Sequence, residues 1–300
     1  MWSERREEEN DGGGWPPLVA VAFVILSSAL VVSPAGACTC RGSSVWGFLA
    51  PADGRLPVNA AGVAWYRPPS SKSFTLVLAQ VSVEMRAEDG TFDQVPAVVE
   101  AVDSFPGVFV IGPRDGFRPG ATYRFSDRGE RRRTAPERVT VTVDDAPLEA
   151  ATPLSLSIWP LYSETISVSV GSGTCQAPLW VAQVLTEVAL PEPFQEWRDQ
   201  LLYRTFVDGR IWRPRSHLCN HIPPGRNWRE TPAEDLLFSE CSDPTGQTRR
   251  YPFYQENVRH QGLDPTEHAV RVQAFLPGTD VVLESEAVSA DLSCPGYLEP

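Results

Sequence analysis

The densest group of metal-ligating side chains in this 300-residue sequence is the run His217-Leu218-Cys219-Asn220-His221. Imidazole and thiolate are ligands that zinc prefers, so this spacing could hold a zinc ion. In an oxidising compartment, however, Cys219 would be in a disulfide, which leaves two histidines in a proline-rich loop without a fixed third ligand. We therefore expect no metal site and no cofactor.

Catalytic motifs are missing from the sequence, which contains no Gly-x-Ser-x-Gly, no His-Glu-x-x-His and no phosphate-binding glycine loop. The pair Asp144-Asp145 could bind calcium at a junction between modules, but an isolated acidic pair is more typical of a solvated turn. Arg131-Arg132-Arg133, with Arg128 nearby, could contact an acidic polymer or form a solvated connection between strands. We expect no catalytic residues, and a protein that is not an enzyme.

Two tryptophans, Trp212 and Trp228, are the predicted binding surface. They flank a cysteine-bounded polar loop, and an exposed indole ring can stack on a sugar. Trp197 is interpreted differently, because Phe194, Trp197 and Leu201 have the spacing of one face of a short helix. We expect that helix to pack onto the fold.

Six cysteines make an even set, as expected of a disulfide framework in an exported chain. None lies between residues 42 and 174, so the second half of the chain would carry most of the cross-links. Six cysteines allow fifteen connectivities. The sequence suggests two pairings, Cys219 with Cys241 and Cys175 with Cys294. The candidates are Cys38, Cys40, Cys175, Cys219, Cys241 and Cys294.

The N-terminal segment resembles a targeting signal. Leu18 to Val32 is a run of fifteen uncharged residues, and Ala35-Gly36-Ala37 follows it as an A-x-A cleavage site. The acidic residues before the run depart from a positive n-region, which leaves an uncleaved anchor open, and Cys38 resembles the lipidated cysteine of a bacterial lipoprotein. We expect residues 1–37 to be a signal peptide or membrane anchor and residues 38–48 a short N-terminal segment.

After this leader the sequence predicts an all-β fold. Glycine and proline together make 50 of 300 residues, which favours short strands joined by turns over long helices. Val139, Val141 and Val143 alternate with threonines, the period of a strand that is buried on one face. The first module contains seven predicted strands: 61–66, 74–80, 81–86, 95–102, 107–111, 122–126 and 138–143.

Residues 49–145 resemble bacterial immunoglobulin-like domains of the S-layer type, so we expect such a domain over residues 49–147. The resemblance rests on Pro51-Ala52-Asp53-Gly54, Leu56-Pro57-Val58-Asn59, the Asp89-Gly90-Thr91 turn and the run from Phe117 to Tyr123. It implies a β-sandwich in which Tyr123 forms a tyrosine corner, with its hydroxyl bonded back to the preceding loop.

Residues 148–300 repeat this pattern in outline, with a weaker resemblance to an Ig-like or fibronectin type III domain. His268 stands where the first module has Tyr123, so we expect it to be a structural corner residue. The polar stretch between Val207 and Arg259 is interpreted as a loop insertion bounded by cysteines. Together the two modules predict tandem Ig-like β-sandwich domains. The further strands predicted here are 154–158, 166–170, 179–188, 202–207, an alternating strand in the segment 263–272, and 281–292.

The charge distribution separates the two modules. The chain carries 26 basic and 38 acidic side chains, a net charge of −12, which argues against binding nucleic acid. Residues 41–147 hold 13 of each sign, whereas residues 148–300 hold 11 basic and 20 acidic side chains. We expect an exported, non-enzymatic structural or protein-binding module, located outside the cell, in the periplasm or at the envelope. The alternative is a carbohydrate-binding accessory module, so the predicted partner is an envelope protein or glycan.

Overall fold

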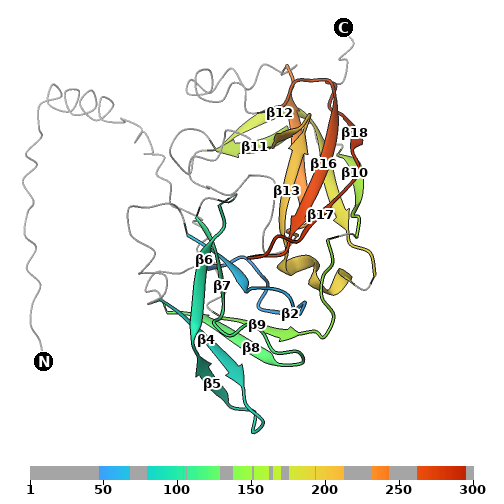
Figure 1. The fold of residues 1–300 in the computed structure, drawn as a ribbon. Coiled ribbons are helices and arrows are strands. Elements are labelled where there is room, and N and C mark those ends of the chain that lie inside the picture. The colour runs from blue at the N-terminus through green and yellow to red at the C-terminus, as the bar shows by residue number, and fades with distance from the viewer. Residues whose placement is uncertain are drawn as a thin grey trace, which may run out of the picture. The chain divides into compact units, whose positions relative to one another are not determined.

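The protein is all-β in the computed structural model, which confirms the predicted fold class (Figure 1). The structure describes residues 47–67, 80–103, 105, 107–128, 138–150, 152–161, 165–169, 176–192, 194–212, 231–242 and 262–294. These residues belong to one compact unit, Cys38–Pro300. The predicted boundary at residue 147 stays a prediction, and we call residues 47–150 the N-terminal half and residues 152–294 the C-terminal half.

Two sheets build the N-terminal half. One has the strand order β1-β3-β7-β6, and the other has the order β2-β9-β8-β4-β5, in which β2 pairs with β9 in parallel. The strands are β1 (Gly47–Phe48), β2 (Asp53–Leu56), β3 (Val63–Tyr66), β4 (Val81–Arg86), β5 (Phe92–Val95), β6 (Ala97–Ala101), β7 (Val108–Pro113), β8 (Thr122–Asp127) and β9 (Arg138–Val143).

Alternating side chains bring the two sheets face to face. The three valines of β9 are buried while the residues between them are exposed or half-buried, as their period of two predicts. The ring of Phe48 on β1 contacts that of Phe125 on β8 edge to face, with the centroids 6.2 Å apart. Trp65 on β3 donates its indole N–H to Asp127 on β8 at 3.0 Å. The N-terminal half is therefore a β-sandwich.

Two further sheets build the C-terminal half. In one, β12 pairs with β10 and β11 along one side and with β15 on the other, and the second has the order β14-β13-β16-β17, with β18 also paired to β16. The elements are β10 (Ser155–Leu161), β11 (Thr165–Ser169), β12 (Gln176–Ala189), the 3₁₀ helix η1 (Phe194–Gln200), β13 (Leu202–Val207), β14 (Arg210–Ile211), β15 (Glu234–Glu240), β16 (Glu267–Phe275), β17 (Val282–Glu284) and β18 (Val288–Asp291).

Five of the described strands were not predicted, and two of them, β1 and β5, are short edge strands of the N-terminal sheets. β2 forms where the sequence indicates a turn, and β14 and β15 lie in the stretch that was interpreted as an insertion. β15 belongs to the centre of the fold, because Asp235 accepts a hydrogen bond from Thr205 of the opposite sheet at 2.6 Å. The loop-insertion interpretation is therefore wrong for residues 234–240.

Candidate functional site

The strand β10 carries two of the three exposed large apolar side chains that the described residues contain. Trp159 is 54% exposed and Leu161 is 38% exposed. Leu156 and Ile158 of the same strand pack against the hydrophobic core. Because side chains alternate along a strand, Trp159 and Leu161 lie on the opposite, outer face of the sheet.

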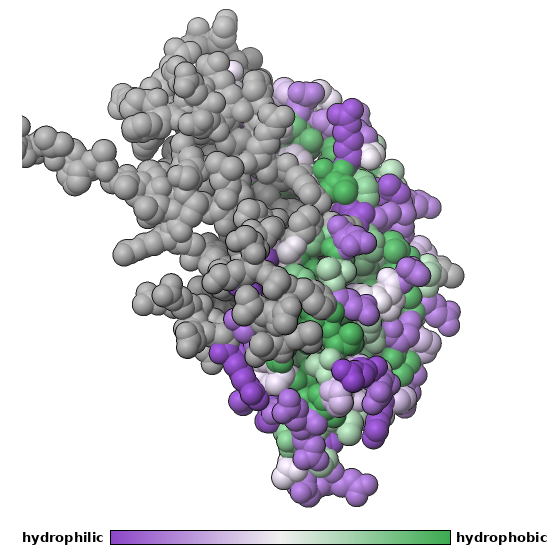
Figure 2. Space-filling view, turned by 60° about the vertical axis from the view of Figure 1, so that its left-hand side comes forward, coloured by the Kyte–Doolittle hydropathy of each residue, from purple (hydrophilic) through white to green (hydrophobic). Residues whose placement is uncertain are grey.

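Trp159 begins an apolar row that crosses the sheet. Its direct neighbour on β12 is Leu185, whose neighbour on β15 is Leu236. Direct partners on adjacent strands share a face, so these three side chains form one row on the outer face. Leu185 and Leu236 are half-buried, and we call the three residues the apolar row. On the face drawn in Figure 2, apolar patches likewise lie among hydrophilic side chains.

The backbone beside this row is an open edge. Among the described strands, β10 pairs only with β12, so its other side has backbone groups without a neighbouring strand. Pro160 interrupts the edge because proline has no N–H to donate, and proline in sheets is found chiefly on edge strands. The edge of β10 therefore combines an exposed indole with backbone groups that no described strand pairs.

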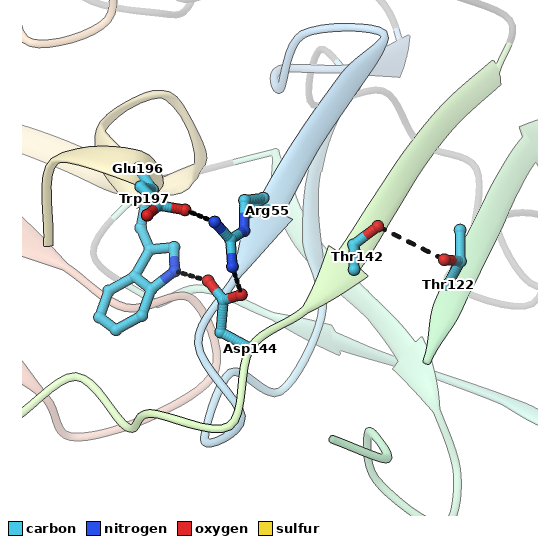
Figure 3. A network of polar contacts seen from close by, with 6 residues as sticks. All are labelled: Arg55, Thr122, Thr142, Asp144, Glu196 and Trp197. Atoms are coloured by element: carbon cyan, nitrogen blue, oxygen red, sulfur yellow. Dashed lines mark hydrogen bonds and ion pairs between the residues drawn. The ribbon is translucent and has the colours of Figure 1, made fainter. Parts of the chain in front are cut away.

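A polar network fixes η1 to the N-terminal half, as Figure 3 shows. The Asp144 carboxylate accepts a hydrogen bond from the indole N–H of Trp197 at 2.7 Å and pairs with the Arg55 guanidinium. Arg55 also pairs with Glu196. The Asp144 side chain is only 11% exposed, so the expectation of a solvated turn is wrong for this residue.

Close packing supports the same junction. Trp197 is buried in a core cluster that includes Trp65 and Phe125, as predicted for a helix that packs onto the fold. A Cβ atom on Gly54 of β2 would lie 2.1 Å from the side-chain nitrogen of Gln200, so a larger residue there would displace the Gln200 side chain. The two halves are thus joined by one core and one ionic network.

A second contact lies between residues distant in the sequence. The rings of Phe105 and Phe275 meet edge to face with their centroids 5.8 Å apart. Arg204 places its guanidinium over the Phe275 ring at 4.4 Å, a cation–π contact. Asn59 also bonds the backbone of Leu148 through its side-chain oxygen and nitrogen, each at 2.9 Å. The aromatic contact and the cation–π contact therefore join the two halves a second time.

Tyrosine hydroxyls bind nearby backbone groups in both halves. Tyr123 is buried, and its oxygen accepts a hydrogen bond from the backbone N–H of Arg118 at 3.1 Å. Tyr203, which the sequence analysis does not single out, donates to the carbonyl of Arg198 at 2.5 Å. Both contacts span five residues back along the chain, the arrangement of a tyrosine corner. The signal for Tyr203 was its place at the start of a predicted strand.

His268 also bonds back to its preceding loop, with one ring nitrogen 2.8 Å from the carbonyl of Asp264. The other nitrogen lies 2.7 Å from the carboxylate of Asp208. Asp208 occupies the two-residue turn between β13 and β14 with a φ of 49°, and its carboxylate also accepts the N–H of Ala269 at 2.9 Å. A carbonyl and a carboxylate only accept hydrogen bonds, so the doubly protonated imidazolium satisfies both contacts.

This arrangement predicts a pH-dependent stability. Burial alone would lower the pKa of His268, but the bonds to the Asp264 carbonyl and the Asp208 carboxylate together raise that pKa above its ordinary value. A raised folded-state pKa gives stability that is full below the unfolded pKa of about 6.5 and is lost as pH rises through the folded pKa. We expect the thermal midpoint to fall over that window, and the fall to be smaller in His268→Gln. An equal fall in both proteins would contradict the prediction.

Trp212 is not exposed, contrary to the predicted binding surface. It is only 6% exposed, its indole N–H donates to the carbonyl of Leu236 at 3.0 Å, and its ring contacts Phe238 edge to face. The strand β15, absent from the sequence prediction, supplies both partners. Trp228 lies outside the described residues.

One disulfide is described, between Cys241 and Cys294. It excludes the suggested pairings of Cys219 with Cys241 and of Cys175 with Cys294. The physical reason is again β15, because Ser239 donates to the carbonyl of Leu292 at 2.6 Å and so aligns the segments that end in the two cysteines. The other four candidate cysteines lie outside the described residues: Cys38, Cys40, Cys175 and Cys219.

Other predicted features lie outside the described part of the chain, namely the leader, the pair His217 and His221, and the run Arg131–Arg133. Within the described ranges, no helix is long and apolar enough to cross a membrane. The same ranges contain no cluster of three or more metal-ligating side chains. A comparison of the chain with protein-family models gives no match, and a comparison with curated proteins gives none either.

Proposed function

We propose that the protein is a non-enzymatic exported module that binds another protein at the edge of β10. The observation that carries this proposal is Trp159, an indole 54% exposed on an edge strand with apolar neighbours. A tryptophan can bury roughly 150–250 Å², and tryptophans are enriched among the residues that dominate binding energy. Leaving such a side chain in water on a rigid strand favours an interaction role.

The chemistry of the edge indicates the kind of partner. An extended segment can add a strand to β10, with main-chain hydrogen bonds providing affinity and alternate side chains providing specificity. The apolar row would accommodate apolar side chains of that segment. Glu187 and Glu234 lie on the same face two residues along β12 and β15, and both pair with the guanidinium of Arg198.

We also propose where the protein is located. The leader and the disulfide are both typical of export, so we place the protein outside the cell, in the periplasm or at the envelope. In this proposal residues 1–37 are either a signal peptide that is cleaved or an anchor that is retained. A further alternative is that they are removed and Cys38 is lipidated. The same proposal includes a relationship of the first module to bacterial Ig-like domains.

The carbohydrate-binding alternative depended on an exposed pair of tryptophans. Trp212 is buried and hydrogen-bonded to β15, which removes one member of that pair. We therefore propose a protein partner.

The experiment compares two single variants. The purified chain serves as bait for envelope proteins, and each captured protein is then purified and its affinity measured by calorimetry. Trp159→Ser is expected to weaken binding about tenfold or more, since a hot-spot truncation costs ~2 kcal/mol. Ile211→Ser is the matched control, because Ile211 is also exposed (38%) but lies on β14. A partner that binds both variants as tightly as the unmodified chain would contradict the assignment to β10.

A further inference from the structure

A cavity of about 710 Å³ lies beside the sheet β2-β9-β8-β4-β5. Ser82 on β4, Ser126 on β8 and Arg138 on β9 line it and are direct neighbours across the three strands. The adjacent row, Val83, Phe125 and Val139, is fully buried in the core. Because side chains alternate, the serine–arginine row lies on the outer face of the sheet.

The cavity has an excess of positive charge. Arg124 donates to Glu84 at 2.5 Å and lies over the Phe92 ring, so these two charges neutralise each other. Arg128 and Arg138 also line the cavity, and neither has an ion pair with any residue that the structure describes. Among the residues that the structure describes, these two guanidinium groups therefore have no counter-charge, in a chain whose net charge is −12.

Asp127 also lines the cavity, but its side chain lies on the core side of the sheet. Asp127 is the cross-strand partner of Val81, and both side chains are buried on the core side of the sheet. Its carboxylate oxygen accepts the indole N–H of Trp65 at 3.0 Å. It is therefore engaged with the core.

A buried hydroxyl completes the lining. Ser82 is only 4% exposed, and its hydroxyl oxygen has no hydrogen-bond partner among the described residues. Buried polar groups in native proteins are normally paired, and an exception calls for an explanation. Ser126 places a second hydroxyl beside it. The cavity is therefore lined by the guanidinium groups of Arg128 and Arg138 and by two serine hydroxyls.

We propose that this cavity binds a hydroxylated carboxylic acid of the uronic acid class. Guanidinium groups bind carboxylates through two parallel hydrogen bonds, so Arg128 and Arg138 would hold the acid group. Ser82 and Ser126 would bond the sugar hydroxyls. The volume is within the roughly 300–1,000 Å³ of small-molecule sites and exceeds the need of a bare ion. The described lining residues include no aromatic ring, so they offer a neutral sugar no stacking platform.

Titration of the full chain with D-glucuronate at low salt, followed by calorimetry, tests this proposal. Arg128→Gln and Arg138→Gln are each expected to weaken binding about tenfold, because each removes a charge-assisted contact. Arg114→Gln is the matched control, since Arg114 is exposed, lies in the turn after β7 and does not line the cavity. D-glucose, which lacks the carboxylate, is expected not to bind.

Ser82→Ala provides an independent test. Its hydroxyl has no partner in the described fold, so this variant should weaken glucuronate binding several-fold while the thermal midpoint of the free protein stays unchanged. Three results would overturn the proposal: no binding of glucuronate at millimolar concentration, equal binding by the Arg128/Arg138 double variant, or sulfate binding as tight as glucuronate. The last would indicate a site for a bare anion.

Discussion

Replacement of Trp197 by alanine is expected to lower the free energy of unfolding by about 3–5 kcal/mol, the usual cost of truncating a buried aromatic side chain. Trp197 is 2% exposed and packs in the core cluster that includes residues of both halves. The variant loses this packing and the hydrogen bond to Asp144 together. Urea unfolding followed by far-ultraviolet circular dichroism measures the change.

Trp197→Phe separates the two contributions. Phenylalanine keeps most of the apolar volume but cannot donate a hydrogen bond, so it should cost about 1–3 kcal/mol, the value of a bond to a charged group. Because Asp144 also pairs with Arg55, the carboxylate retains one partner in this variant. If Trp197→Ala destabilised the protein no more than Trp197→Phe, packing at the junction would contribute nothing and the prediction would be wrong.

The hydrogen bond between Asp144 and Trp197 can be measured separately from packing by a double-mutant cycle. Asp144→Asn and Trp197→Phe, made singly and together, report the coupling between the carboxylate and the indole N–H. We attribute little stability to the pair of Arg55 with Glu196, because both side chains are about half exposed. Glu196→Gln therefore serves as the control variant and should change the free energy of unfolding by less than about 1 kcal/mol.

The sequence predicted elements whose signals are local. The bounds of β4, β9 and β13 agree with the prediction, because each is a run with strand-forming residues between clear turn signals. The short helix at Trp197 was also predicted from the spacing of its apolar residues. Alternation in β10 could further have placed Trp159 on the outer face, since Ser155 and Ser157 share its phase while Leu156 and Ile158 face the core.

Features that depend on distant pairing could not be predicted in this way. β2 has polar residues and becomes a strand only because β9, far along the chain, pairs with it in parallel. The contacts of Asp144 depend on this pairing, since Arg55 lies on β2. The interpretation of β15 as part of a loop also led to two other wrong expectations, because β15 buries Trp212 and aligns Cys241 with Cys294. One missed central strand therefore accounts for the wrong expectations about both the binding surface and the disulfide.

Removal of the disulfide by the double substitution Cys241→Ser and Cys294→Ser is expected to lower the free energy of unfolding by about 4 kcal/mol, as the loop-entropy model gives for this separation. The bond spans 53 residues of sequence and links the segment after β15 to the segment after β18. Without the bond the unfolded chain can adopt more conformations, and this larger entropy favours the unfolded state.

The double substitution avoids leaving a single reactive thiol, which could pair with another cysteine of the chain. Far-ultraviolet circular dichroism with urea measures the change, and the unmodified chain in reducing agent should shift in the same direction. The contacts of β15 within the sheet, seven direct pairs with β12 from Val181 to Glu187, remain in the variant. We therefore expect the variant to fold with its sheets intact and a lower midpoint. A midpoint unchanged from that of the oxidised chain would show that the sheet alone, and not the cross-link, fixes the end of β15.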